Sequence, residues 1–275
     1  MHEKNRRLPV NDGHLFFEAA GTGEPVVFLH GFGLDSRMWS PQVSASQSQF
    51  RTITYDLRGF GRSSLPTEAS YAHEDDLNAL LSHLGAAPAH VVGLSMGGRM
   101  ALRFAAAYPK SVRSLVLADS ALDGHSWSAD WQTRWAAMCE CAKMGRLDEA
   151  RRQWFEHPLF DSARSNKFSA QPLASMVEDY SGWHWHNKDN ARVQSPPLSE
   201  RLAEIRVPSL VMIGEHDIAD FQAIGSFLAE KLPNVRHSII KGAGHMVNLE
   251  APQEFNTIVM AFWQESLATD TAFDR

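Results

Sequence analysis

The hydrophobic residues of this chain fall into two alternating patterns. Continuous apolar runs of five or six residues recur along the sequence, which is typical of strands buried on both faces of a parallel sheet. Between them, apolar residues return at helical spacing, as in Leu77, Leu80, Leu81 and Leu84. Gly85 follows, where it can end the helix. Strands that alternate with helices predict an α/β fold with a mostly parallel, twisted sheet flanked by helices.

The elements follow in a regular order. Predicted strands lie at residues 25–29, 51–55, 112–117, 208–213 and 235–240, with a shorter apolar run at 91–92. A hairpin is predicted from Val10 to Gly21, around the turn sequence Asn11-Asp12-Gly13. Predicted helices span 77–84, 96–108, 221–232 and 252–267. In such sheets ligands bind at the carboxyl ends of the strands, so chemistry is expected there.

The alternation stops between residues 121 and 206. This interval is far too long for a strand-to-helix connection, and it holds six of the eight tryptophans. Trp127, Trp131 and Trp135 recur every four residues, and Trp131, Trp135 and Met138 continue one helical stripe. We interpret residues 121–206 as a helical cap inserted after the sixth strand, and residues 1–120 with 207–275 as the core domain.

Most of the cap's aromatic rings are expected to pack its own core, and a minority to line a substrate pocket, because the underside of a cap faces the strand ends. The candidates for this pocket are Trp131, Trp135, Trp154, Trp183, His184, Trp185 and Met246.

Charge and cysteine content narrow the class of protein. The formal net charge of -6, with no basic tract, argues against nucleic acid or an anionic membrane as a partner. No apolar stretch approaches the roughly 18 residues of a membrane span, and the charged N-terminus lacks the apolar run of a secretory signal. Cys139 and Cys141 are spaced for neither a redox motif nor a zinc site. We therefore expect reduced thiols and a cytoplasmic protein.

The segment around Ser95 carries the strongest chemical signal. In Gly93-Leu-Ser-Met-Gly97, an apolar run enters a sharp turn and a helix follows immediately. Small residues on both sides allow the strand and helix to approach, and the turn exposes the serine hydroxyl at a helix N-terminus. A serine that only caps the helix is the alternative. The rest of the chain favours a nucleophile.

A serine nucleophile needs a base and an acid that orients the base. His245 follows the last predicted strand in a glycine-rich loop, and Asp217 follows the strand before it. Asp119 and Glu215 are rival carboxylates, because each also lies just beyond a strand. The developing oxyanion also needs two backbone N–H donors.

The chain resembles the α/β-hydrolase superfamily from the His14 region to the last helix. The motifs that carry the resemblance are His30-Gly31-Phe32-Gly33, Asp56-Leu-Arg-Gly-Phe-Gly-Arg-Ser63, Gly93-Leu-Ser-Met-Gly97, Gly214-Glu-His-Asp217 and Gly244-His245. Ser95, Asp217 and His245 follow the order of the catalytic triad in this superfamily. Phe32 and Met96 match its oxyanion donors, and His30 is expected to brace the loop of Phe32.

The motifs are similar to those of carboxylesterases, 3-oxoadipate enol-lactonases and carbon–carbon bond hydrolases. Ser95 stands where haloalkane dehalogenases and epoxide hydrolases carry aspartate, which disfavours those activities. Met246 follows the histidine where carbon–carbon hydrolases of aromatic catabolism often carry tryptophan, and this departure disfavours that branch.

We expect a serine hydrolase that cleaves a small-to-medium ester or lactone through an acyl-enzyme. A carbon–carbon bond hydrolase and a hydrolase-fold sensor with little turnover are the alternatives. No cofactor is needed. His184 and His186, on one side of a strand-like segment, could bind a metal, but without a further ligand cluster we expect none. The sequence carries no signal of oligomeric state.

Overall fold

A single mixed sheet organises the computed structural model, which describes the backbone of residues 3–273 and the side chains of residues 6–267. Within these residues the sheet has eight strands in the order β1-β2-β4-β3-β5-β6-β7-β8. The strands are β1 (Glu3–Val10), β2 (Gly13–Ala20), β3 (Pro25–Leu29), β4 (Arg51–Tyr55), β5 (Ala89–Leu94), β6 (Val112–Ala118), β7 (Ser209–Gly214) and β8 (Val235–Ile240). The hairpin of β1 and β2 is antiparallel, β2 also pairs antiparallel with β4, and the other pairings are parallel.

The burial of the strands explains why their sequences read as apolar runs. Every residue of β5 and β7 is buried, because helices cover both faces of these central strands. β8 lies at the edge, and only Ile240 of its six residues is buried. The predicted α/β-hydrolase fold, with its mostly parallel sheet and flanking helices, is confirmed.

Within the described part of the chain, six helices surround the sheet. They are α1 (Ser40–Ser46), α2 (His73–Leu84), α3 (Met96–Ala107), α9 (Ala219–Lys231), α10 (Val247–Glu250) and α11 (Pro252–Phe273). α2 packs on α3, and α1 packs on α11. Gly85 ends α2 as predicted, in the left-handed conformation at φ 56°. No helix among the described residues has the length and apolar content needed to cross a membrane.

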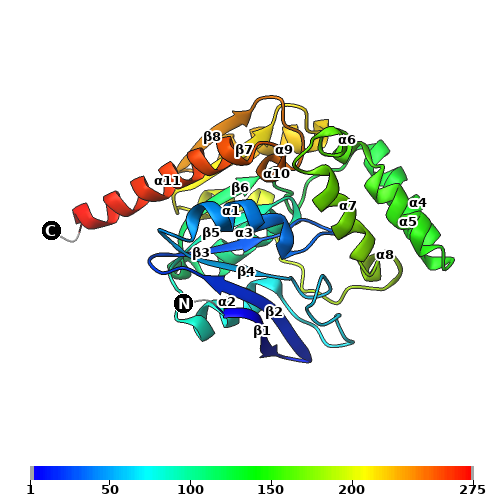
Figure 1. The fold of residues 1–275 in the computed structure, drawn as a ribbon, viewed down its shortest axis with the longest axis horizontal. Coiled ribbons are helices and arrows are strands. Elements are labelled where there is room, and N and C mark those ends of the chain that lie inside the picture. The colour runs from blue at the N-terminus through cyan, green and yellow to red at the C-terminus, as the bar shows by residue number, and fades with distance from the viewer. Residues whose placement is uncertain (1–2, 274–275) are drawn as a thin grey trace.

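The interval between β6 and β7 is helical, as predicted. It contains α4 (Ala129–Lys143), α5 (Leu147–Phe155), α6 (Asp161–Ser165), α7 (Ala170–Asp179) and α8 (Trp183–His186). Figure 1 shows these helices, in green, beside the sheet at the ends of its strands. α4 packs on α5 and α8, and α5 packs on α7. The borders of this cap at residues 121 and 206 stay a prediction.

One local feature of the cap differs from the prediction, and another agrees with it. Residues 183–186 form a helical turn rather than a strand-like segment, because Gly182 adopts a left-handed conformation and the turn buries Trp185. Trp127 lies outside α4, since Ser128 caps this helix and its side chain accepts a hydrogen bond from the N–H of Trp131. The predicted helical stripe of Trp131, Trp135 and Met138 lies within α4.

Candidate active site

Ser95 occupies the sharp turn between β5 and α3. Its backbone has φ 56° and ψ -117°, a conformation that non-glycine residues rarely adopt. A Cβ atom on Gly97 would lie 2.2 Å from the carbonyl oxygen of Leu29, and one on Gly93 would lie 2.3 Å from backbone atoms of Gly97. Both positions therefore exclude side chains. The glycines on both sides allow the turn that carries Ser95.

His245 and Asp217 form a buried hydrogen-bonded pair. His245 Nδ1 lies 2.8 Å from Asp217 Oδ2, and Asp217 Oδ1 accepts a hydrogen bond from the N–H of Ile218 at 2.7 Å. The loops that carry them follow the adjacent strands β7 and β8. With Nδ1 donating to the carboxylate, Nε2 has the lone pair that a general base requires.

Ser95 lies on the same edge of the sheet as this pair. It follows β5, which is joined through β6 and β7 to β8, so all three residues stand at carboxyl ends of neighbouring strands. Phe221 links them: its ring centroid is 4.3 Å from that of His245, and it lines one pocket with Ser95. Among the described residues, no hydrogen bond joins Ser95 Oγ to His245. Such bonds are often loose before a substrate binds.

The rival carboxylates make other contacts. Asp119 Oδ1 accepts a hydrogen bond from the N–H of Gly214 at 2.8 Å, and its buried Oδ2 has no partner among the described residues. Burial and the nearby Asp217 raise the pKa of Asp119 well above its usual value. Glu215 accepts a hydrogen bond from the N–H of Gly242 and so braces the loop after β8. The imidazole of His245 is paired with Asp217.

Glu250, which the sequence analysis missed, holds the loop of His245 in place. Its carboxylate accepts hydrogen bonds from the backbone N–H groups of Gly244 at 2.8 Å and Met246 at 2.9 Å, on both sides of the histidine. The hydroxyl of Ser162, from α6 of the cap, donates to the same carboxylate. The sequence signal was a glutamate at the end of the apolar stretch Met246-Val-Asn-Leu-Glu250.

The candidate oxyanion donors lie where the motif places them. Met96 begins α3, and Phe32 lies in the loop after β3. Neither N–H donates a hydrogen bond to another group within the described part of the chain. His30 braces the Phe32 loop: its Nδ1 bonds to the carbonyl of Gly31 at 2.8 Å, and its Nε2 accepts from the N–H of Leu57 at 2.9 Å.

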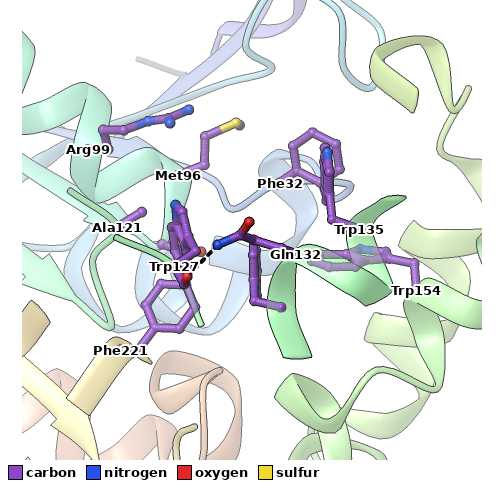
Figure 2. A pocket seen from close by; sticks show the side chains of 11 residues that line it. Phe32, Met96, Arg99, Ala121, Trp127, Gln132, Trp135, Trp154 and Phe221 are labelled. Carbon is purple, nitrogen blue, oxygen red and sulfur yellow. Dashed lines mark hydrogen bonds between the residues drawn. The ribbon is translucent and has the colours of Figure 1, made fainter. Parts of the chain in front are cut away.

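A cavity of about 480 Å³ opens above Ser95. It is lined by Phe32, Ser95, Met96, Arg99, Ala121, Trp127, Trp131, Gln132, Trp135, Trp154 and Phe221. In Figure 2, Trp127 and Phe221 stand at one end, and Phe32, Trp135 and Trp154 at the other, with Gln132 between them. The largely aromatic lining suits an apolar portion of a substrate.

Only part of the predicted pocket faces this cavity. Trp131, Trp135 and Trp154 line it, because α4 and α5 turn one face toward Ser95. Trp183, Trp185 and Met246 do not line it, and neither does His184. Trp185 is buried against Tyr180 with ring centroids 4.9 Å apart, Met246 is fully buried, and Trp183 stacks edge-on against His184.

His184 belongs to a neighbouring cavity of about 330 Å³. Its ring stacks on Phe60 at 4.3 Å, and its Nδ1 bonds to the hydroxyl of Tyr180 at 2.9 Å. Arg99, Trp127, Gln132 and Phe221 line the main cavity but were missing from the predicted pocket. Arg99 could have been found, because it lies one helical turn beyond Ser95.

In the described residues, only Asp119, Asp217 and His245 bring three possible ligand atoms within 4.8 Å of one another. This group includes the pair of His245 and Asp217, whose facing atoms already share a hydrogen bond. His184 and His186 are not part of it.

A strained serine between strand and helix, with an acid-bound imidazole at the same edge of the sheet, is the arrangement of α/β hydrolases. The chain belongs to this family: the family model described as alpha/beta hydrolase fold matches residues 24–252.

Named relatives are similar over most of the chain. It is 29% identical to 3-oxoadipate enol-lactonase 1 of Acinetobacter baylyi, over 86% of this chain and 87% of that one. It is 28% identical to the 2-hydroxy-6-oxononadienedioate/2-hydroxy-6-oxononatrienedioate hydrolase of Burkholderia vietnamiensis, over 92% and 93%. The crystal structure of carboxylesterase CesB (YbfK) from Bacillus subtilis matches with a TM-score of 0.78 and 25% identity, over 96% and 92%. These similarities support a hydrolase activity on a small molecule.

Proposed function

We propose that this protein is a serine hydrolase that cleaves a small-to-medium carboxylic ester or lactone through an acyl-enzyme. The observation that carries the proposal is the 2.8 Å contact between His245 and Asp217, at the strand edge where Ser95 opens into an aromatic cavity. The similarity to an enol-lactonase and a carboxylesterase supports the choice of ester and lactone.

In the first half-reaction, Ser95 Oγ attacks the carbonyl carbon while His245 Nε2 accepts the hydroxyl proton. Asp217 stabilises the resulting imidazolium. The N–H groups of Phe32 and Met96 donate to the oxyanion of the tetrahedral intermediate. When the intermediate collapses, His245 gives its proton to the departing alkoxide. The alcohol is released, and the acyl group remains on Ser95.

The second half-reaction repeats these steps with water. His245 accepts a proton from the water as it attacks the acyl carbon, and the same N–H groups hold the second oxyanion. The bond to Oγ then breaks, Ser95 recovers the proton from His245, and a carboxylic acid leaves. In a lactone the alcohol and the acid are one molecule, so the ring opens without loss of a fragment.

The Ser95→Ala variant tests this proposal. It is expected to lower kcat for 4-nitrophenyl esters by about 10⁵- to 10⁶-fold, because the nucleophile is lost. Mass spectrometry of the wild type, quenched during turnover, is expected to find the acyl adduct on Ser95 and none in the variant. Substantial turnover by Ser95→Ala would contradict the proposal.

A carbon–carbon bond hydrolase is the second candidate, because of the similarity to the Burkholderia enzyme. A panel of aryl esters, enol-lactones, thioesters and a vinylogous 1,5-diketone acid separates the two. We expect the highest kcat/KM with an ester or lactone. A higher value with the diketone acid would favour carbon–carbon cleavage.

The same proposal includes the division of the chain and its compartment. We assign residues 1–120 and 207–275 to the core and 121–206 to the cap, supported by the mutual packing of α4, α5, α7 and α8.

Cys139 and Cys141 are free thiols, which supports a cytoplasmic location. Both are expected to react with iodoacetamide in protein denatured directly from fresh lysate without reductant.

A further inference from the structure

Among the described residues that line the cavity containing Ser95, Arg99 is the only one with a charged side chain. Its N–H donates to the carbonyl of Ser95 at 3.1 Å, so the two residues stand one turn of α3 apart. In Figure 2 its guanidinium lies near the Met96 side chain, at the edge of the cavity. A cation so close to the nucleophile can contact the substrate directly.

The guanidinium of Arg99 is poorly paired within the protein. Its nearest carboxylate belongs to Asp123, whose Oδ1 lies 3.9 Å from Arg99 Nε. Asp123 is already bound through both oxygens to Arg103, at 2.6 and 2.8 Å. Arg99 Nε is buried and has no hydrogen-bond partner among the described residues. Arg99 therefore retains donors and positive charge for another anion.

Arg99 also stands where two cavities meet. The neighbouring cavity of about 330 Å³ shares four lining residues with the main one: Phe32, Met96, Arg99 and Trp135. Its further polar side chains are His73, Arg103, His184 and Asp189.

Of these further groups, only Asp189 can carry a negative charge. Burial lowers the pKa of His73 well below its usual range and that of His184 to about 4, so both are neutral at pH 7. Asp189 Oδ1 accepts hydrogen bonds from the hydroxyl of Tyr71 and the N–H of Ala191, both at 3.0 Å, and Oδ2 lies 4.0 Å from His184 Nε2. Among the described residues, Asp189 makes no ion pair with Arg99.

Building on the proposed function, we propose that Arg99 binds a free carboxylate at the distal end of the substrate. The preferred substrate would then be an ester or lactone that carries a second, ionised carboxyl group, such as a hemiester of a dicarboxylic acid. Guanidinium and carboxylate form paired, charge-assisted hydrogen bonds. One helical turn, about 5.4 Å along the axis, separates Ser95 from Arg99, so a short aliphatic chain can join the two groups.

A matched pair of substrates tests this inference: 4-nitrophenyl hydrogen adipate and its methyl ester, which differ in the distal charge. We expect the wild type to have at least a 10-fold higher kcat/KM for the adipate hemiester. In Arg99→Gln, the ratio of the two kcat/KM values is expected to fall roughly 10- to 100-fold. Arg99→Lys is expected to give an intermediate ratio, because it keeps the charge and loses the fork.

The control variant is Arg134→Gln, which removes an exposed cation of α4 outside the cavity lining. It is expected to keep the wild-type ratio. An equal kcat/KM for both esters in the wild type, or an unchanged ratio in Arg99→Gln, would overturn the carboxylate site and leave the serine hydrolase intact. Failure of the wild type to hydrolyse either ester would instead count against the proposed function.

Inhibition gives a second measurement that needs no folded variant. Adipate is expected to inhibit the wild type competitively at least 10-fold more strongly than adipamide, and added salt is expected to weaken it. Equal inhibition by the two compounds would overturn the inference.

Discussion

Asp119 and Asp217 bring two carboxyl groups to one imidazole, yet their surroundings differ. Asp217 contacts His245 and accepts a backbone hydrogen bond from Ile218. Asp119 is completely buried, and its pKa is raised by desolvation and by the charge of Asp217. Burial therefore favours the protonated form of Asp119, whereas Asp217 is the carboxylate that contacts the imidazole.

This difference predicts a small loss of kcat for one substitution and a large loss for the other. Asp119→Asn is expected to keep kcat within about 10-fold of the wild type, because asparagine is neutral, has the same shape and tolerates φ 41°. Asp217→Asn is expected to lower kcat by about 10⁴-fold through loss of the imidazole's ionic partner. Steady-state kinetics with one aryl ester measures both. The reverse order would make Asp119 the acid.

At the scale of elements, the loop between β8 and α10 depends on one carboxylate. Glu250 accepts N–H groups from Gly244 and Met246, and Ser162 of α6 donates to it as well. Asn166, also from the cap side, donates to the backbone carbonyl of Glu250 at 3.0 Å. The position of His245 is therefore tied both to its own loop and to the cap.

Glu250→Gln is expected to lower kcat by about 10- to 100-fold with a smaller change in KM, because an amide nitrogen would face one of the N–H donors and shift His245. Ser162→Ala removes only the cap's contribution and is expected to have a smaller effect. Glu254→Gln, an exposed position on α11, is the control. A loss confined to KM would show that Glu250 does not position the base.

The elements themselves were predictable where the signal is local. The runs at 25–29 and 112–117 are strands because burial on both faces demands apolar residues throughout. Gly93 and Gly97 reveal the serine turn because only glycine fits their backbone contacts. Residues 183–186 gave no such signal, since four aromatic residues suit a strand or a helix, and the packing of Trp185 decided between them.

At the scale of the whole molecule, the pocket lining depends on how the cap sits on the core, which periodicity does not encode. Phe221 and Gln132 belong to different parts of the chain and meet at one cavity. The hydrogen bond between Ser162 and Glu250 likewise joins residues 88 positions apart. Ser95, Asp217 and His245 could be proposed as catalytic residues from the sequence because their motifs directly follow predicted strands.

Several histidines are buried in the neutral form across the molecule. Burial lowers the pKa of His90 to about 3, and those of His157 and His184 to about 4. In the unfolded chain each titrates near pH 6.5. Between about pH 6.5 and 4 the unfolded chain therefore binds protons that the folded protein does not. The contribution of these histidines to the free energy of unfolding is therefore fully present above pH 6.5 and is lost as the pH falls.

The free energy of unfolding is expected to fall by roughly 1 kcal/mol per pH unit for each histidine. Urea unfolding at pH 7.5, 6 and 5 measures it, and His90→Gln is expected to give a shallower decline because one titrating group is gone. Glutamine can keep the hydrogen bond to Ser114. Asp119 acts with opposite sign through its raised pKa, but equally in both proteins. Parallel declines would contradict the assignment to His90.

Phe32 has two duties that cannot be separated. Its backbone N–H is a candidate oxyanion donor. Its ring packs against Trp135, Trp154 and Tyr180 of the cap, with ring centroids 5.1 to 5.6 Å apart. A substrate too large for the space between the core and the cap would displace this ring and, with it, the backbone N–H of Phe32. Substrates that are too large would then have a lower kcat as well as a higher KM, so the core and the cap together select substrates by width.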